Sequence, residues 1–112
     1  MTFGIVQKSG VTVLTIEGKM VGGPDATSLA ETLRSLIEKG QKSFVVNMKK
    51  VDWMNSSGLG ILIGSLTTVR NHGGDFRLCC LGQKPRELLE ITKLDCVFSS
   101  YPTEEEAVAS FS

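Results

Sequence analysis

The sequence contains no apolar run that approaches the roughly 18 residues of a membrane-spanning helix, and its start, MTFGIVQKSG, lacks the apolar core of a signal peptide. It also lacks a charge imbalance, because 12 basic residues are matched by 12 acidic ones. A basic surface for nucleic acid or for an anionic membrane is therefore not expected. These absences indicate a cytoplasmic protein that binds neither nucleic acid nor membrane.

Metal-binding and catalytic side chains are scarce. There is one histidine, His72, and the three cysteines have no CxxC spacing. Cys79 and Cys80 are adjacent in a predicted strand, which would point their side chains to opposite faces and prevent them from sharing a metal. Cys96 lies in another apolar run. We therefore expect three buried thiols that pack as small hydrophobes, with no metal and no cofactor.

What the sequence does contain is an alternation of extended and helical patterns in 112 residues, a length suited to one domain with its own core. The expected strands are the segment before residue 7, Val11–Glu17, Ser43–Met48, Phe76–Leu81 and Cys96–Phe98. The expected helices begin at Pro24, near Ser56, at Pro85 and at Thr103, where Glu106 completes a capping box. The order β-β-α-β-α-β-α-β-α predicts a single α/β domain, 1–112, in which a leading hairpin joins a parallel sheet packed with about four helices.

Polar residues gather at the start of the second predicted helix, in the stretch DWMNSSGLGILIG (Asp52–Gly64). Asn55, Ser56 and Ser57 all suit a helix cap, but one residue is enough for that purpose, so the others are surplus to folding. In an open sheet of this type, ligands and partners meet the loops at the carboxyl ends of the strands. The loops concerned are Met20–Asp25, Lys49–Ser57 and Gly82–Lys84. The position of the stretch therefore favours a functional site.

Two glycines within the same helix predict a close contact with a neighbouring element. Gly60 and Gly64 are four residues apart and therefore share one helical face. Glycine inside a helix costs up to about 1 kcal/mol relative to alanine. We therefore expect a packing reason for both.

Common catalytic and phosphate-binding motifs do not fit the stretch. A nucleophile elbow needs GxSxG, and His72 stands a full helix away from Ser56, too far to act as its base. No lysine follows the glycines as a phosphate loop requires. Gly58-x-Gly60 matches the start of a dinucleotide loop, but the third glycine comes one position late. We expect no enzymatic activity, with a small nucleotide- or ligand-binding role as an alternative.

The segment VDWMNSSGLG, Val51–Gly60, resembles the signature of STAS domains, in particular that of the bacterial anti-sigma factor antagonists. That signature reads hydrophobic-Asp-Ser-[Ser/Thr]-Gly-[Leu/Ile]-Gly after a buried strand. The resemblance extends over essentially the whole chain, including its length, its order of elements and the paired glycines Gly73-Gly74 before the fourth strand. It implies a STAS-type mixed β-sheet and a role in signal transduction.

The resemblance also implies a mechanism of partner switching. In that family a serine kinase of the GHKL type, which is also the anti-sigma factor, phosphorylates the serine after the acidic position. A metal-dependent serine phosphatase removes the phosphate. Carried onto this chain, the phosphoacceptor is Ser56, with Ser57 as the alternative. The unphosphorylated protein would bind the anti-sigma factor and release the sigma factor for transcription, whereas the phosphorylated protein would not.

The expected partner-binding residues are Met20, Val21, Trp53, Asn55, Ser56, Ser57 and Gly58. Met20, Val21 and Trp53 are expected to be exposed and to anchor the partner, although Trp53 could instead cover the sheet edge. Asn55 and Val21 stand where the family's pattern has acidic residues. This departure implies a different recognition surface or an altered switch. It keeps a second role open: a non-switched STAS scaffold, or a small subunit of a stress-signalling or lipid-transport complex.

Overall fold

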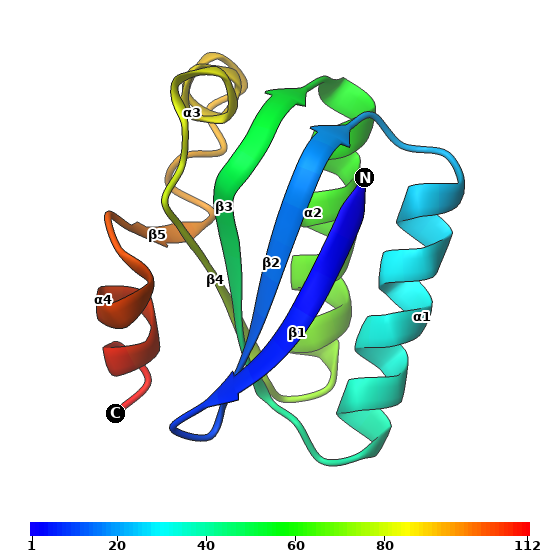
Figure 1. The fold of residues 1–112 in the computed structure, drawn as a ribbon, viewed down its shortest axis with the longest axis vertical. Helices are drawn as coiled ribbons and strands as arrows, with labels where there is room; N and C mark the ends of the chain where they lie inside the picture. Colours follow the sequence, from blue (N-terminus) through cyan, green and yellow to red (C-terminus); the bar gives the residue numbers. More distant parts are fainter.

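The computed structural model describes all residues, 1–112, and contains one five-stranded sheet in the order β1-β2-β3-β4-β5 (Figure 1). The strands are β1 (Thr2–Lys8), β2 (Val11–Met20), β3 (Ser43–Met54), β4 (Asp75–Cys79) and β5 (Ser99–Tyr101). The helices are α1 (Pro24–Glu38), α2 (Ser56–Asn71), α3 (Gln83–Ile91) and α4 (Glu104–Ala109). The predicted α/β class, the order of elements and the mixed sheet with four helices are confirmed.

The strand directions follow from the connections between them. β1 and β2 form an antiparallel hairpin, and the turn between them places Ser9 and Gly10 at φ of 52° and 79°. Two successive positive φ values are typical of tight two-residue hairpin turns. The other neighbouring strands are parallel, because a helix returns the chain to the same end of the sheet between each pair. The carboxyl ends of β2, β3 and β4 therefore lie at one edge of the sheet.

The two faces of the sheet are covered unequally. Helices α1 and α2 pack on one face and enclose a core of 19 buried residues. In Figure 1, α2 lies behind the strands and α1 lies to the right of β1. The opposite face carries a smaller cluster beneath α4. Its buried members are Val11, Val13, Val45, Cys79 and Ala107. Strand alternation explains the division, since Leu14 and Ile16 of β2 face the larger core while Val11 and Val13 face the smaller one.

Polar contacts at both ends of α4 fasten it to the sheet. At its start, the Glu104 carboxylate accepts hydrogen bonds from Lys8 and from Asn47, the latter at 3.0 Å. Beyond its end, the Ser110 hydroxyl accepts a hydrogen bond from the guanidinium of Arg77. The position of this short helix therefore depends on Lys8 of β1, the Asn47 amide of β3 and Arg77 of β4.

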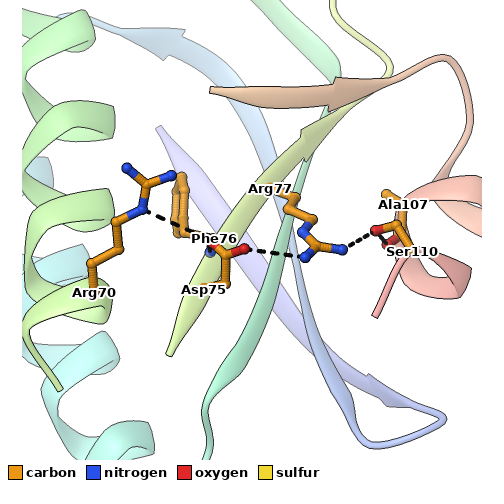
Figure 2. Close-up of polar contacts among 6 residues, drawn as sticks. All are labelled: Arg70, Asp75, Phe76, Arg77, Ala107 and Ser110. Carbon is orange, nitrogen blue, oxygen red and sulfur yellow. Dashed lines mark hydrogen bonds and ion pairs between the residues drawn. The ribbon is translucent and has the colours of Figure 1, made fainter. Parts of the chain in front are cut away.

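Arg77 also belongs to a group of charges at the amino end of β4, drawn in Figure 2. Asp75 lies 3.1 Å from Arg77 and 3.7 Å from Arg70 of α2, and it accepts a hydrogen bond from the Phe76 N–H at 2.9 Å. Burial acts to raise the pKa of Asp75, but the Phe76 N–H and the Arg77 guanidinium outweigh it and hold that pKa below its ordinary value. These contacts connect α2, β4 and α4 at the end of the sheet opposite to the strand-to-helix loops.

The predicted position of the last strand is wrong. Cys96–Phe98 continues the turn after α3, and the Phe98 N–H points to the Leu94 carbonyl oxygen at 3.4 Å. The apolar side chain of Phe98 packs into the larger core from this turn, with its ring centroid 6.4 Å from that of Phe76. The strand that pairs with β4 is instead the polar segment β5. Main-chain pairing makes this segment a strand, and its amino-acid composition gives no indication of it.

The contact predicted for two glycines of α2 is also absent. Gly60 and Gly64 are exposed, and a Cβ at either position would meet nothing within 4 Å. Ile63 is likewise 38% exposed. The buried residues of the helix are Gly58, Leu59, Ile61, Leu62, Ser65, Leu66 and Val69. Packing of this face on the sheet rotates the two glycines towards solvent.

Only one of the three thiols is buried. Cys79 ends β4 and is fully buried, whereas Cys80 is half-buried and Cys96 is exposed. The prediction fails for Cys96 because its segment is a turn and not a strand. It fails for Cys80 because β4 ends before it and its φ of 59° turns the chain out of the strand conformation.

Candidate partner-binding site

The predicted site lies where β2 and β3 end and α2 begins, at the upper edge of the sheet in Figure 1. Main-chain pairing continues to the last residues of both strands, so that Met20 is opposite Met54 and Lys19 is opposite Trp53. Both strands are therefore longer than predicted. The sequence pattern had placed their ends at Glu17 and Met48. The extra length brings the loop after β2 to the first turn of α2.

Asn55 is the residue that caps α2. Its backbone is extended, at φ −110° and ψ −174°, and its Oδ1 accepts a hydrogen bond from the Gly58 N–H at 2.9 Å. Its carbonyl oxygen accepts the first helical bond, from Leu59. Substitution of a cap of this kind by alanine costs about 1 kcal/mol. The cap is complete without either serine, so the hydroxyls of Ser56 and Ser57 are available for another role.

Ser56 and Ser57 form the exposed first turn of the helix. Their backbone N–H groups have no acceptor within the helix, as at every helix start. The positive end of the helix dipole adds to the potential of these groups and favours an anion there. A phosphate attached to Ser56 would therefore meet unpaired donors and a favourable field.

Gly58 and Gly22 let the loop after β2 lie directly against this turn. A Cβ on Gly58 would fall 1.9 Å from the Met20 carbonyl oxygen, so only glycine fits without movement of the backbone. Gly22 has φ of 93°, and a Cβ there would fall 2.9 Å from the Cβ of Ser57. The same contact argues against a dinucleotide loop, because Gly58 faces a protein carbonyl and leaves no space for a pyrophosphate.

Of the predicted apolar anchors, two are exposed and one is not. Val21 and Trp53 are 42% and 46% exposed, and they line a shallow depression together with Lys19 and Asp52. Met20 is fully buried, which contradicts its predicted exposure. It is the last residue of β2, and strand alternation directs its side chain into the larger core.

Lys84, which ends the third of the predicted partner-facing loops but is not among the predicted partner-binding residues, lies beside Trp53. The Nζ of Lys84, in the first turn of α3, is 6.0 Å from the centroid of the indole ring. The contact joins elements about 30 residues apart in the chain, so no local spacing could have indicated it. With Lys19 on the other side, two cations and the single carboxylate of Asp52 surround the exposed indole.

The structure confirms that His72 cannot assist Ser56. The two residues lie at opposite ends of α2, and its 16 residues span about 24 Å. The Nδ1 of His72 is 2.7 Å from the Thr68 carbonyl oxygen. No group of three or more His, Cys, Asp or Glu side chains is arranged to hold a metal ion. None of the helices has both the length and the apolar character needed to cross a membrane.

Comparisons with known proteins identify the family of this chain. Residues 3–107 match the family described as the STAS domain. The chain is 26% identical over 102 residues to BtrV of Bordetella bronchiseptica, described as a candidate anti-sigma factor antagonist, and the match covers 91% of this chain and 87% of BtrV. It is 30% identical over 84 residues to YvdB of Bacillus subtilis, a candidate sulfate transporter, covering 75% of this chain and 16% of that protein.

Solved structures of related fold cover nearly the whole chain. A crystal structure of a candidate anti-sigma factor antagonist from Thermotoga maritima superposes with a TM-score of 0.86 at 22% identity, covering 96% of this chain and 92% of that one. The Bacillus cell fate determinant SpoIIAA in its phosphorylated form gives a TM-score of 0.75 at 18% identity, covering 99% and 100%. These identities are low, so the superpositions establish a common fold.

Proposed function

Because the chain belongs to the STAS domain family, we propose that it is an anti-sigma factor antagonist switched by phosphorylation of Ser56. The unphosphorylated protein binds a serine kinase of the GHKL type that is also the anti-sigma factor, and this binding releases the sigma factor. A serine phosphatase restores the binding form. In this proposal the protein acts in the cytoplasm as a binding module and has no catalytic activity of its own.

The observation that carries the proposal is the division of roles between Asn55 and Ser56. Asn55 caps α2, while Ser56 is exposed in the first turn with a hydroxyl that the cap does not use. A kinase can therefore modify Ser56 without removing a contact that the fold needs. The similarity to BtrV and to other proteins described as anti-sigma factor antagonists supports this assignment.

The switch acts at the interface and leaves the fold intact. A phosphate adds about −1.5 to −2 charges, and at a helix start the free N–H groups and the dipole stabilise it. The helix is therefore at least as stable after phosphorylation. A docked partner, in contrast, would have to accommodate a bulky, strongly hydrated anion next to the exposed Val21 and Trp53 side chains. The phosphorylated form consequently binds weakly.

Asn55 and Val21 occupy positions where the family's pattern has acidic residues. The surface around the exposed indole carries Lys19 and Lys84 with only Asp52 to oppose them. The partner of this chain therefore recognises a less acidic surface than the usual antagonist presents.

The test starts with capture of partners from the native host on the purified protein, followed by mass spectrometry of bait and partners. The kinase recovered is then purified and incubated with ATP and the protein, and the phosphopeptide is mapped. Phosphate on Ser56, lost in Ser56→Ala and retained in Ser57→Ala, is the expected result. Phosphate on Ser57 alone, or on neither serine, contradicts the proposal.

A second candidate function is a non-switched STAS scaffold or small subunit of a stress-signalling or transport complex. The match to part of YvdB favours it, because STAS domains also occur within proteins described as transporters. This role predicts that capture returns subunits of a transporter or of a larger complex and no kinase. It also predicts that Ser56→Asp binds those subunits as well as the wild type does.

A further inference from the structure

Two neighbouring cysteines at the end of β4 lie on the same side of the sheet. Cys79 is part of the small core under α4, and Cys80 packs against that same core. In a continuous strand the two side chains would point to opposite faces. The φ of 59° at Cys80 reverses this, and a hydrogen bond from its N–H to the Tyr101 carbonyl oxygen, at 3.1 Å, holds the turn in place.

A positive φ is uncommon for a residue with a side chain and is sterically unfavourable. Glycine, which would adopt it without penalty, follows two residues later at position 82. The fold therefore holds a thiol in a strained conformation that brings it beside a second thiol. An observed strain of this kind justifies a search for a function.

We propose that Cys79 and Cys80 form a dithiol site for trivalent arsenicals. Cys80 provides the entry, because it is half-buried and lines an open cavity of about 450 Å³. The cavity lies between Asn47 and Lys49 of β3, Cys80 and Leu81 after β4, and the start of α4 at Glu104. It has room for the organic group of a monosubstituted arsenical, while the arsenic bridges the two sulfur atoms.

Arsenic suits this pair better than a disulfide bond does. The Cα atoms of adjacent residues are about 3.8 Å apart across a trans peptide, which is shorter than the roughly 4.4–6.8 Å of ordinary disulfides. A direct sulfur–sulfur bond would therefore be strained and easily reduced. A third atom between the sulfurs widens the ring and removes that constraint.

A divalent metal suits the pair less well. Such a metal needs thiolate ligands and usually four donors, but no third suitable ligand is placed here. Burial, reinforced by the neighbouring Cys80 thiol, raises the pKa of Cys79 well above its ordinary value, so its thiolate is costly to form. Soft sulfur ligands do match a soft trivalent centre, and the resulting arsenic dithiolate carries no net charge into the small core.

The binding step balances without a redox partner. An organic arsenoxide and two thiols form two As–S bonds, while two S–H bonds and the As–O bond break. Both protons and the oxygen leave together as water. Arsenic stays trivalent and sulfur keeps its oxidation state, so no electron acceptor is required.

The test uses phenylarsine oxide and the folded protein, with intact mass spectrometry under native conditions. We expect one phenylarsenic group per chain, removed by 2,3-dimercaptopropanol but not by the monothiol glutathione at equal thiol concentration. Cys80→Ser, at the half-buried position, should weaken binding at least about 100-fold because chelation is lost. Cys96→Ser is the matched control and should bind as the wild type does. Equal binding by wild type and Cys80→Ser, or an adduct confined to Cys96, overturns the proposal.

Thermal unfolding distinguishes binding of the arsenical to the folded protein from its reaction with the unfolded chain. A ligand of the native state raises the unfolding temperature, whereas one that binds only the unfolded chain lowers it. We expect phenylarsine oxide to raise the unfolding temperature of the wild type and of Cys96→Ser, and to leave that of Cys80→Ser unchanged. A decrease for the wild type overturns the proposal. Cys79→Ala, which keeps an apolar group in the core, provides a second variant with the same expected loss of binding.

Discussion

At the start of α2, three adjacent residues with similar capping ability have different surroundings. Asn55 holds the Gly58 N–H, while Ser56 and Ser57 lie in the exposed first turn. Asn55→Ala should therefore lower the free energy of unfolding by about 1 kcal/mol. Ser56→Ala should change it by no more than about 0.5 kcal/mol. Urea unfolding of the two variants decides the matter, and an equal loss in both would show that Ser56 shares the cap.

The glycines of the same helix give a second prediction at this scale. Gly58→Ala places a Cβ against the backbone oxygen of Met20, which cannot rotate away, and should destabilise by about 1–3 kcal/mol. Gly60→Ala is the matched control, because it meets open space and removes a helix-weakening glycine. It should be neutral or stabilising by up to about 1 kcal/mol. Similar melting temperatures for the two variants would contradict the contact at Gly58.

The sequence indicated which residues of α2 are special but not how they are used. Spacing identified Gly60 and Gly64 as sharing one face, but it does not say which face turns inwards. That rotation is set by contact with the sheet, whose β2 strand runs to Met20 and reaches Gly58. The positive φ of Cys80 is a second feature that the sequence did not predict, because no residue pattern indicates it. Local chemistry is readable from sequence, whereas contacts between distant elements are not.

At the scale of elements, α4 depends on a carboxylate whose ionisation should be visible in stability. Hydrogen bonds from Lys8 and Asn47 lower the pKa of Glu104 below its ordinary value of 4.5. A carboxyl with a lower pKa in the folded state stabilises the fold above the pKa of the unfolded chain. That contribution is lost as the pH falls through the folded-state value.

Glu104→Gln should therefore be less stable than the wild type at neutral pH, and the difference should shrink as the pH falls below about 4.5. Melting temperatures of both proteins between neutral pH and pH 3 measure it. Asp75→Asn is a useful companion variant, since the pKa of Asp75 is also lowered. The stability that this variant loses at neutral pH should likewise shrink as the pH falls. A difference for Glu104→Gln that is constant with pH would mean that the ionised form contributes nothing.

Elements with an apolar pattern could be predicted, and elements without one could not. The helices and the four longer strands follow from periodicity and turn residues. β5 could not be found because its residues are polar and exposed, and only pairing with β4 makes them a strand. The strand was predicted instead at the nearby run Cys96–Phe98, which is apolar. Phe98 packs into the core, but it does so from a turn.

On the scale of the whole molecule, the candidate site and the main polar network occupy opposite ends of the sheet. The order of hairpin and alternating units was sufficient to predict this architecture, because parallel strands joined by helices place every strand-to-helix loop at one edge. Figure 1 shows α2 extending from that edge to the end where Arg70 meets Asp75. A phosphate added at the loop edge would therefore be remote from the charges that fasten α2 and α4, and it could change recognition without a change in stability.

This separation gives the last prediction, which distinguishes a switch from a cap. Ser56→Asp adds a negative charge at the candidate interface and suits the positive end of the helix dipole. It should therefore keep or slightly raise the free energy of unfolding while weakening partner binding by at least about tenfold, or about 1.4 kcal/mol. Ser56→Ala should bind as the wild type does. Ser35→Asp, an exposed position in the second half of α1, adds the same charge far from the site and should bind normally. Titrations with the purified kinase, monitored by the emission of Trp53 (the only tryptophan), measure binding beside melts by circular dichroism. Equal binding by Ser56→Asp and Ser56→Ala would end the switch hypothesis, because the added charge would then have no effect on recognition.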